Sequence, residues 1–264
     1  MTGLDAVRAR LEEVVRSAGP IALAHFGRSE ARWKADESPV TDADVAVERH
    51  LVDALGVAFP EDGVVSEEGG RRESRSGAIW YVDPIDGTSA FVQGLAHWGP
   101  TACRVHPERG FDVGAFFVPL LGAMWSGALG HGAFFNGARM PAMPDRPCGR
   151  RDFLFVPSRI HRWPGLPWPG KVRALGSTAA HLALVAQGAG SATIIPRWSR
   201  WDVGCGVILA REVGLLIHNR YGETVDPAVC SEGLPLLVGA PTALEILESG
   251  GWARSAGTDT ASGA

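Results

Sequence analysis

Hydrophobic residues at the start of the chain recur at the three- and four-residue spacing of an α-helix. This pattern covers residues 4–22 and stops before Gly27, which predicts an amphipathic helix that packs on a core. A second pattern of the same kind covers residues 45–58, and Thr41 or Asp42 would cap the N-terminus of that helix. The chain is therefore expected to open with two core-facing helices.

The pattern then changes to the short hydrophobic runs that are typical of β-strands. The runs are residues 64–65, 78–82, 99–105 and 112–130. Asn136-Gly137 follows them as a strong two-residue turn signal. We therefore expect an antiparallel sheet in this part of the chain.

A segment rich in proline and arginine, residues 140–151, links these strands to a second set of elements. In that set strands are expected at 153–156, 171–175, 192–195 and 215–217, and helices at 177–188 and 202–212. The chain is thus predicted to have an N-terminal α+β half, residues 1–145, and a smaller C-terminal α/β half, residues 146–250. Residues 251–264 are rich in small and polar residues and are expected to form a disordered tail.

Composition excludes several classes of partner. The formal net charge of -4 gives no broad basic field, which argues against binding to a nucleic-acid polymer or to an anionic membrane. No run reaches the roughly 18 to 20 apolar residues of a membrane span, and the first 27 residues carry too many charges for a secretory signal. The four cysteines have no zinc or disulfide spacing, so a reducing cytoplasm is the expected location.

The strand at 78–82 leads into Asp83-Pro84-Ile85-Asp86-Gly87-Thr88, which is the most informative segment of the chain. Proline fixes the backbone between the two aspartates, so both carboxylates and the carbonyl of Ile85 can converge on one metal cluster. Magnesium prefers such oxygen ligands. An Asx turn at a strand end, without a metal, would have the same sequence.

A phosphate site is predicted beside this metal site. If a helix starts after Gly87, the backbone N–H groups of Gly87, Thr88 and Ser89 would face an anion, and the helix dipole would attract it. Metal and phosphate would then meet at one strand end. That combination indicates metal-assisted phosphate chemistry.

Three further acidic residues lie at the ends of predicted elements, where side chains from separate parts of the chain can meet. These are Asp42, Glu67 and Asp202. Asp202 begins a predicted helix, so an N-terminal cap is an equally good interpretation of that residue alone.

Several motifs in this order resemble the inositol monophosphatase superfamily. The matching residues are Lys34, 38–44, 67–68, 83–88 with Phe91, 132–137 and 201–203. The resemblance runs from about Lys34 to about Asp226. It implies an α-β-α-β-α five-layered sandwich and a lithium-sensitive phosphomonoesterase that uses two or three Mg²⁺ ions, with Mn²⁺ as a substitute. The family is often dimeric, so a homodimer is an implied assembly.

The resemblance also implies roles for individual residues. Glu67, Asp83, the Ile85 carbonyl and Asp86 are similar to the family's metal ligands, and Asp202 joins Asp83 and Asp86 on a second ion. Asp42 resembles the residue that holds a third ion or its water, and Thr88 resembles the hydroxyl that orients the attacking water together with Asp42 or Glu67. Gly87, Thr88 and Ser89 resemble the phosphate contacts. The implied reaction is hydrolysis by metal-activated water without a covalent intermediate.

The substrate side matches less closely. Thr178 and His181 resemble residues that face the alcohol half of the substrate. Inositol-hydrolysing members have a glutamate seven residues before the position of Asp202, and Ile195 stands there instead. This argues against inositol 1-phosphate as the main substrate.

Arg197 and Arg200 place positive charge near the expected pocket, which is similar to the 3'(2'),5'-bisphosphate nucleotidase branch, and residues 34–41 also resemble the histidinol-phosphatase branch. Ordinary solvated arginines are the alternative. The substrate is thus expected to be a small phosphorylated metabolite such as an inositol, sugar, histidinol or nucleotide phosphate.

Two competing hypotheses remain for the function. A haloacid-dehalogenase type phosphatase would use an aspartyl nucleophile in Asp-x-Asp-Gly-Thr, but two residues separate Asp83 from Asp86 here. A catalytically silent metal-binding homologue would tolerate loss of the acidic residues, yet all of them and Thr88 are present. Both observations favour an active metal-dependent phosphatase.

Overall fold

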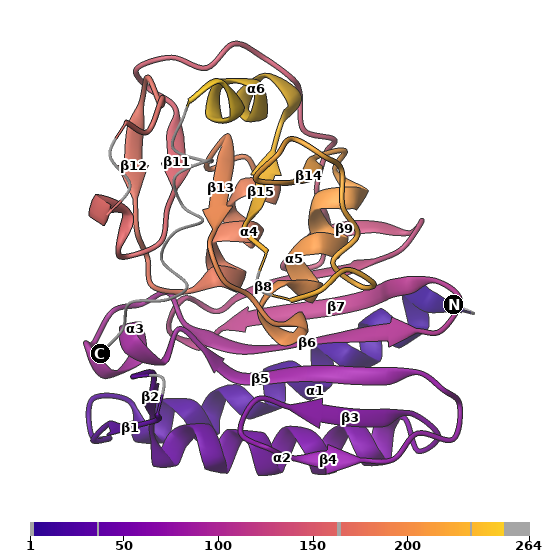
Figure 1. Cartoon of the computed structure of the whole chain (residues 1–264). Coiled ribbons are helices and arrows are strands. Elements are labelled where there is room, and N and C mark those ends of the chain that lie inside the picture. The colour runs from indigo at the N-terminus through magenta and orange to yellow at the C-terminus, as the bar shows by residue number, and fades with distance from the viewer. Residues whose placement is uncertain (1–2, 36, 163–164, 233, 251–264) are drawn as a thin grey trace.

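The computed structural model describes residues 3–35, 37–162, 165–232 and 234–250 (Figure 1). The tail predicted at 251–264 lies outside these residues. Among the described helices, none combines the length and the hydrophobicity that crossing a bilayer requires.

Two long helices, α1 (Leu4–His25) and α2 (Asp42–Ala58), form the first layer, as the sequence predicts. A short hairpin of β1 (Arg32–Trp33) and β2 (Pro39–Val40) connects them. Helix α2 begins at a capping box, because the Thr41 hydroxyl accepts from the Ala43 N–H and the Asp44 carboxylate accepts from the Thr41 N–H. This cap fixes where α2 starts and which of its side chains face inward.

An eight-stranded sheet packs against these helices. In spatial order its strands are β10 (Ala138–Arg139), β9 (Gly132–Phe135), β8 (Ala123–Ala128), β7 (Gly110–Val118), β6 (Gly99–His106), β5 (Ile79–Asp86), β3 (Gly63–Ser66) and β4 (Arg71–Arg72). All neighbours are antiparallel except β3 and β5. The turn predicted at Asn136-Gly137 joins β9 to β10, and both residues have positive φ.

A second, five-stranded sheet belongs to the C-terminal part of the chain. Its order is β12 (Lys171–Arg173), β11 (Phe153–Phe155), β13 (Ala192–Ile195), β15 (Leu236–Gly239) and β14 (Leu216–Asn219). Strand β11 is parallel to both of its neighbours, whereas β15 is antiparallel to β13 and β14. Short helices α3 (Thr88–Val92), η1 (Pro119–Leu121) and η2 (Ile160–Arg162) lie in connections.

Two helices, α4 (Thr178–Ala186) and α5 (Arg200–Glu212), lie between the two sheets, and α6 (Pro241–Ser249) covers the outer face of the second sheet (Figure 1). The order of layers is therefore α-β-α-β-α, which confirms the predicted sandwich. The boundaries of the two halves, at 145 and 250, stay a prediction.

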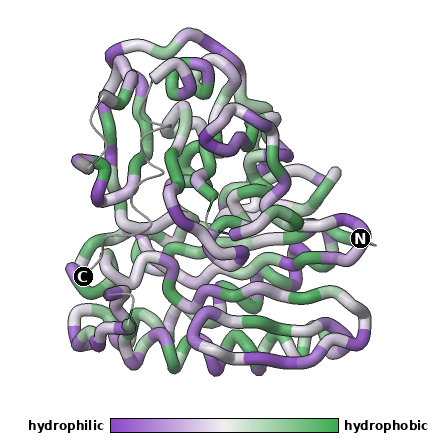
Figure 2. The backbone as a smooth tube through the Cα atoms, viewed as in Figure 1, coloured by the Kyte–Doolittle hydropathy of each residue, from purple (hydrophilic) through white to green (hydrophobic). Residues whose placement is uncertain are grey.

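Three clusters of buried hydrophobic side chains separate the layers. One lies between α1, α2 and the large sheet, the second surrounds α4 and α5, and the third lies under α6. Full burial of one large aliphatic or aromatic side chain stabilises a fold by about 1.5–3 kcal/mol. Figure 2 shows hydrophobic colour along the inner strands and helices and hydrophilic colour in many peripheral turns. The layers thus form a rigid support for residues at the strand ends.

Sequence patterns missed several elements, among them β4, β15 and α6. Strand β15 is buried between β13 and β14, so its hydrophobic run has no alternation by which to recognise it.

Candidate active site

The end of β5 turns two aspartates into the interior. Asp83 and Asp86 are almost fully buried, and the pairing of β5 with β6 shifts register between them. Pro84 lies within this shift and has no N–H to donate to the ladder. The Ile85 N–H donates to Asp83 Oδ1 at 2.9 Å, which fixes the turn. The predicted Asx turn and the predicted acidic pair therefore occur together.

Asp202 reaches the same place from the first turn of α5. Ligand atoms of Asp83, Asp86 and Asp202 all lie within 4.8 Å of one another. Asp202 Oδ2 also accepts from the Ser199 N–H at 2.7 Å as part of a capping box. The Asp202 carboxylate can therefore cap helix α5 and also belong to the acidic cluster.

Burial and mutual repulsion make this cluster unfavourable as three anions. Burial is the main cause that raises the pKa of Asp83, and the neighbouring charges of Glu67 and Asp86 add to it. The pKa of Asp202 is raised for the same reasons, burial first and then Asp86. Burial raises the pKa of Asp86 to about 7. Cations would reverse this penalty.

Helix α4 supports Asp86 from the C-terminal part of the chain. The Ser177 hydroxyl donates a short hydrogen bond to Asp86 Oδ2, and the N–H groups of Thr178 and Ala179 donate at 3.2 and 3.0 Å. A side chain on Gly87, whose φ is +91°, would lie 3.0 Å from the Ser177 Cβ. Asp86 thus joins the end of β5 to the N-terminus of α4, a contact that the sequence patterns do not predict.

Glu67 approaches from the turn after β3. Its N–H donates to the Val82 carbonyl at 3.1 Å, which places it beside the end of β5. Lys34 Nζ lies 3.0 Å from Glu67 Oε1 and 2.6 Å from Glu68 Oε1. Burial lowers the pKa of Lys34, but the hydrogen bonds to Glu68 and Glu67 outweigh it and raise the pKa overall.

The structure corrects the place predicted for Asp42. Its side chain is 77% exposed and forms an ion pair with Arg32 at 2.9 Å, away from the cluster. Asp44 is buried instead, and its carboxylate accepts from the hydroxyls of Thr41 at 2.6 Å and Thr88 at 3.1 Å. Burial raises the pKa of Asp44.

Asp42 and Asp44 face opposite ways because of the helical period. Residues two positions apart in an α-helix lie about 200° apart around its axis. An acidic residue three positions after a threonine cap marks a capping box, and that signal identifies Asp44 in the sequence. The sequence analysis overlooked it.

The predicted phosphate segment lies beside the acidic cluster. Gly87 caps α3 in the left-handed conformation, and Thr88 is the first residue of that helix. The Thr88 hydroxyl lies 3.1 Å from the Asp44 carboxylate and 3.1 Å from the Ile85 carbonyl, to which it can also donate. Ser89 is exposed.

A pocket of about 180 Å³ adjoins the site through Ser177 and Thr178. Its other lining residues are Pro157, Ser158, Gly176, His181 and 194–197. His181 is 5% exposed, its Nε2 accepts from the Leu175 N–H at 2.9 Å, and its ring stacks on Phe155. Burial lowers the pKa of His181 to about 4, so the ring is a neutral wall of the pocket.

The two predicted arginines have different surroundings. Arg197 is exposed, lines the pocket and has no ion-pair partner within the described part of the chain. Arg200 forms an ion pair with Glu232 at 2.9 Å, and its guanidinium lies over the Tyr81 ring. The structure therefore brings Arg197 to the pocket, and it engages Arg200 in packing around α5 instead of the substrate side.

The donor set of the cluster fits a hard cation. Its ligand atoms are carboxylate oxygens, and none of Asp83, Asp86 and Asp202 forms an ion pair among the described residues. Magnesium prefers oxygen donors of this kind and keeps several waters. The cluster can therefore bind a metal ion next to the pocket.

Comparison with known proteins gives the family. The model of the inositol monophosphatase family matches residues 4–248. A histidinol-phosphatase of Mycobacterium tuberculosis is 35% identical over 82% of this chain and 90% of its own length. A histidinol-phosphatase of Chlorobaculum parvum is 30% identical over 84% of this chain and 88% of its own.

Among solved structures, the extragenic suppressor protein suhB of Bartonella henselae superposes with a TM-score of 0.82 at 20% identity, and the match covers 96% of this chain and 99% of that one. This likeness confirms the fold. Taken with the family match over nearly the whole sequence, it means that the chain belongs to the inositol monophosphatase family and is a phosphatase of that type.

Proposed function

We propose that the protein is a Mg²⁺-dependent phosphomonoesterase that hydrolyses a small phosphorylated metabolite with a metal-activated water. The observation that carries this proposal is the convergence of three aspartates within 4.8 Å beside the Asp44–Thr88 pair. The pocket next to Thr178 offers room for the alcohol half of the substrate.

The residues that would hold the ions are Asp83, Asp86, Asp202, Glu67 and the carbonyl of Ile85. We propose two or three Mg²⁺ ions, for which Mn²⁺ can substitute. Bound magnesium lowers the pKa of a coordinated water and neutralises charge on the phosphate and on the leaving alkoxide.

Thr88 and Asp44 would orient the attacking water. The Thr88 hydroxyl donates to Asp44, so its oxygen lone pairs remain to accept a hydrogen bond from water. The proton of that water can pass through the hydroxyl to the Asp44 carboxylate, which acts as general base. Asp44 thus takes the catalytic place that the resemblance suggests for Asp42.

The first turn of α3 would hold the phosphate. The N–H groups of Gly87, Thr88 and Ser89 precede the first intrahelical hydrogen bond of α3, which runs from the Phe91 N–H to the Gly87 carbonyl at 2.9 Å. Such groups are donors for an anion. Three backbone donors on one side and metal ions on the other would fix the phosphorus for in-line attack.

For the substrate, we propose histidinol phosphate as the first candidate. Two relatives that match over most of this chain are named histidinol-phosphatases. Ile195 supports it indirectly, because the pocket lacks the carboxylate that would bind the ring hydroxyls of inositol. A substrate with a second phosphate is the alternative, and Arg197 at the pocket favours it.

A phosphate-release screen with Mg²⁺ tests both proposals. Histidinol phosphate, inositol 1-phosphate, a sugar bisphosphate and a 3',5'-nucleotide are compared for unaltered protein, for Arg197→Ala and for Arg49→Ala, which removes an exposed positive charge on α2. If a second phosphate is bound, Arg197→Ala raises KM for bisphosphates about tenfold, as expected for one charge-assisted hydrogen bond. Absence of Mg²⁺-dependent release from every ester would overturn the proposed function.

A further inference from the structure

Glu48 holds the backbone of the turn that carries Glu67. It lies on α2, one helical turn after Asp44. Glu48 Oε2 accepts from the Glu68 N–H at 2.9 Å, and Oε1 accepts from the Gly70 N–H at 3.1 Å. Both carboxylate oxygens are therefore engaged by the turn between β3 and β4, which packs beside α2 (Figure 1).

Other backbone hydrogen bonds hold the two ends of the turn. The Glu67 N–H donates to Val82, which ties one end of the turn to β5, and the Ser66 N–H donates to the Gly70 carbonyl across the turn. A Cβ on Gly70 would lie 3.1 Å from Glu48 Oε1 and 3.0 Å from Val52 Cγ2. The backbone of the turn thus packs directly on Glu48, with no space for a side chain between them.

Lys34 binds the same turn through the side chains of Glu67 and Glu68. Its ammonium bridges Glu67 and Glu68, so it neutralises charge close to the metal site. A metal ion that binds Oε1 of Glu67 must compete with this ammonium for that oxygen. The backbone hydrogen bonds of Glu48 do not depend on that competition, because they involve N–H groups and not the Glu67 side chain.

We propose that Glu48 is a positioning residue that keeps the Glu67 turn in place while the Glu67 carboxylate exchanges Lys34 for a metal ion. Glu48 touches neither metal nor substrate in this role. Helix α2 then positions both Thr88 and the turn that carries Glu67, because Asp44 accepts a hydrogen bond from Thr88 and Glu48 accepts one from the turn. The inference rests on the proposed function in that Glu67 is taken as a metal ligand.

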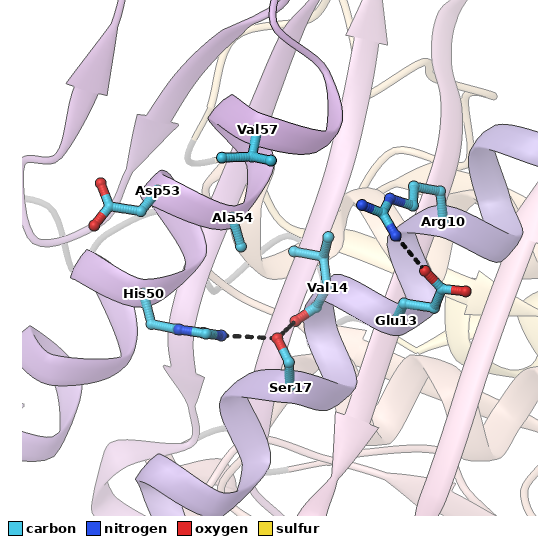
Figure 3. Close-up of a pocket in the computed structure, with 8 residues that line it drawn as sticks. All are labelled: Arg10, Glu13, Val14, Ser17, His50, Asp53, Ala54 and Val57. Carbon is cyan, nitrogen blue, oxygen red and sulfur yellow. Dashed lines mark hydrogen bonds and ion pairs between the residues drawn. The ribbon is translucent and has the colours of Figure 1, made fainter.

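The test compares Glu48→Ala and Glu48→Gln with Asp53→Asn. Asp53 is an exposed acid on the same helix, and Figure 3 marks no hydrogen bond or ion pair between it and the other residues that line a surface pocket between α1 and α2. Mg²⁺ affinity is measured by calorimetry without substrate. Residue-resolved hydrogen exchange of the metal-free protein reports on the turn itself.

The Ala variant should bind Mg²⁺ about tenfold to a hundredfold more weakly, as is typical when a support of a metal ligand is lost. The amides of Glu68 and Gly70 should exchange about tenfold faster, while the Glu67 amide, bonded to Val82, keeps its protection. The Gln variant keeps one acceptor oxygen and should fall between Ala and the unaltered protein. Asp53→Asn should match the unaltered protein in both measurements.

Unchanged Mg²⁺ affinity in Glu48→Ala would overturn this inference, and so would faster exchange spread over α2 and β5, which would indicate a purely structural role. If Ala does not fold, Gln decides by the same two measurements. A protein that binds Mg²⁺ but hydrolyses no ester would contradict the proposed function and leave the calorimetry and exchange to decide on Glu48.

Discussion

The two sides of the site are built in opposite ways. On one side, the strand end, α2 and α5 bring together several carboxylates, and burial raises the pKa of Asp83, Asp86 and Asp44. On the other side, the pocket is walled by small residues, prolines and the neutral ring of His181, with Arg197 as its one charged lining residue among those described. The carboxylate cluster needs protons or cations to compensate its charge, whereas the pocket does not.

This contrast separates chemistry from specificity. The acidic side carries buried charge that protons or bound cations must compensate, and the proposed reaction requires the cations, so its residues are fixed by the reaction. The pocket side makes no such demand, and its residues can differ between family members without loss of the phosphate chemistry.

The largest expected effect is on the acidic side. Asp83→Asn or Asp202→Asn should lower kcat on the order of a thousandfold, because each removes a charged ligand from the metal cluster. Steady-state phosphate release measures this, with circular dichroism to show that the variants fold. Asp53→Asn serves as control, and turnover that stays within a factor of about two in the cluster variants would contradict the metal role.

A matched pair on α2 tests the correction from Asp42 to Asp44. Asp44→Asn should lower kcat about a hundredfold, because it removes the proton acceptor behind Thr88. Asp42→Asn, which breaks only an exposed ion pair with Arg32, should change kcat by less than about twofold. A larger loss of kcat in Asp42→Asn than in Asp44→Asn would show that Asp42, and not Asp44, acts in the reaction.

The metal-free protein should lose stability as pH rises. The unfolded chain releases the Asp86 proton near its ordinary pKa of 3.8, whereas the folded chain keeps it until about 7. Between these values the folded state binds more protons, so its free energy of unfolding falls with pH. We expect a Tm about 5 °C lower at about pH 7.5 than at about pH 5, and Mg²⁺ should restore it.

Asp86→Asn provides the comparison for this experiment, since it removes one titrating group of the cluster and should weaken the dependence of Tm on pH. Scanning calorimetry with and without a chelator measures both proteins. A metal-free Tm that rises steadily over this range, equally in both, would show that the cluster carries no such penalty.

The smallest effect is expected at His181, and it has the opposite sign. Its pKa falls from the ordinary 6.5 to about 4 on folding, so the unfolded chain binds more protons in this window and stability is lost as pH falls. His181→Gln keeps an acceptor for the Leu175 N–H and does not titrate. The variant should lose about 3 °C less in Tm between about pH 6.5 and pH 4.5. Parallel curves would mean that the ring is not held neutral by the fold.

Much of the acidic side was predictable because its signals are local. Pro84 and Gly87 fix the turn within a few residues, so the placement of Asp83 and Asp86 at a strand end follows from their own neighbours. Asp44 was also readable from its capping box with Thr41, although the sequence analysis chose Asp42 instead. Arg197 and Arg200 could not be told apart, because their difference depends on Glu232 and Tyr81, which are distant in sequence.

The sequence by itself determined the helices α1, α2, α4 and α5, the antiparallel strands β6 to β8 and the turn that presents two carboxylates, since these depend on periodicity and on the backbone limits of proline and glycine. The motif resemblance placed Asp202 with these carboxylates, and the tertiary structure brings their oxygens together. Only the tertiary structure decided that Ser177 and the start of α4 support Asp86 and that Glu48 holds the Glu67 turn. The physical reason is that periodicity tells which face of an element is buried but not which distant element packs against it.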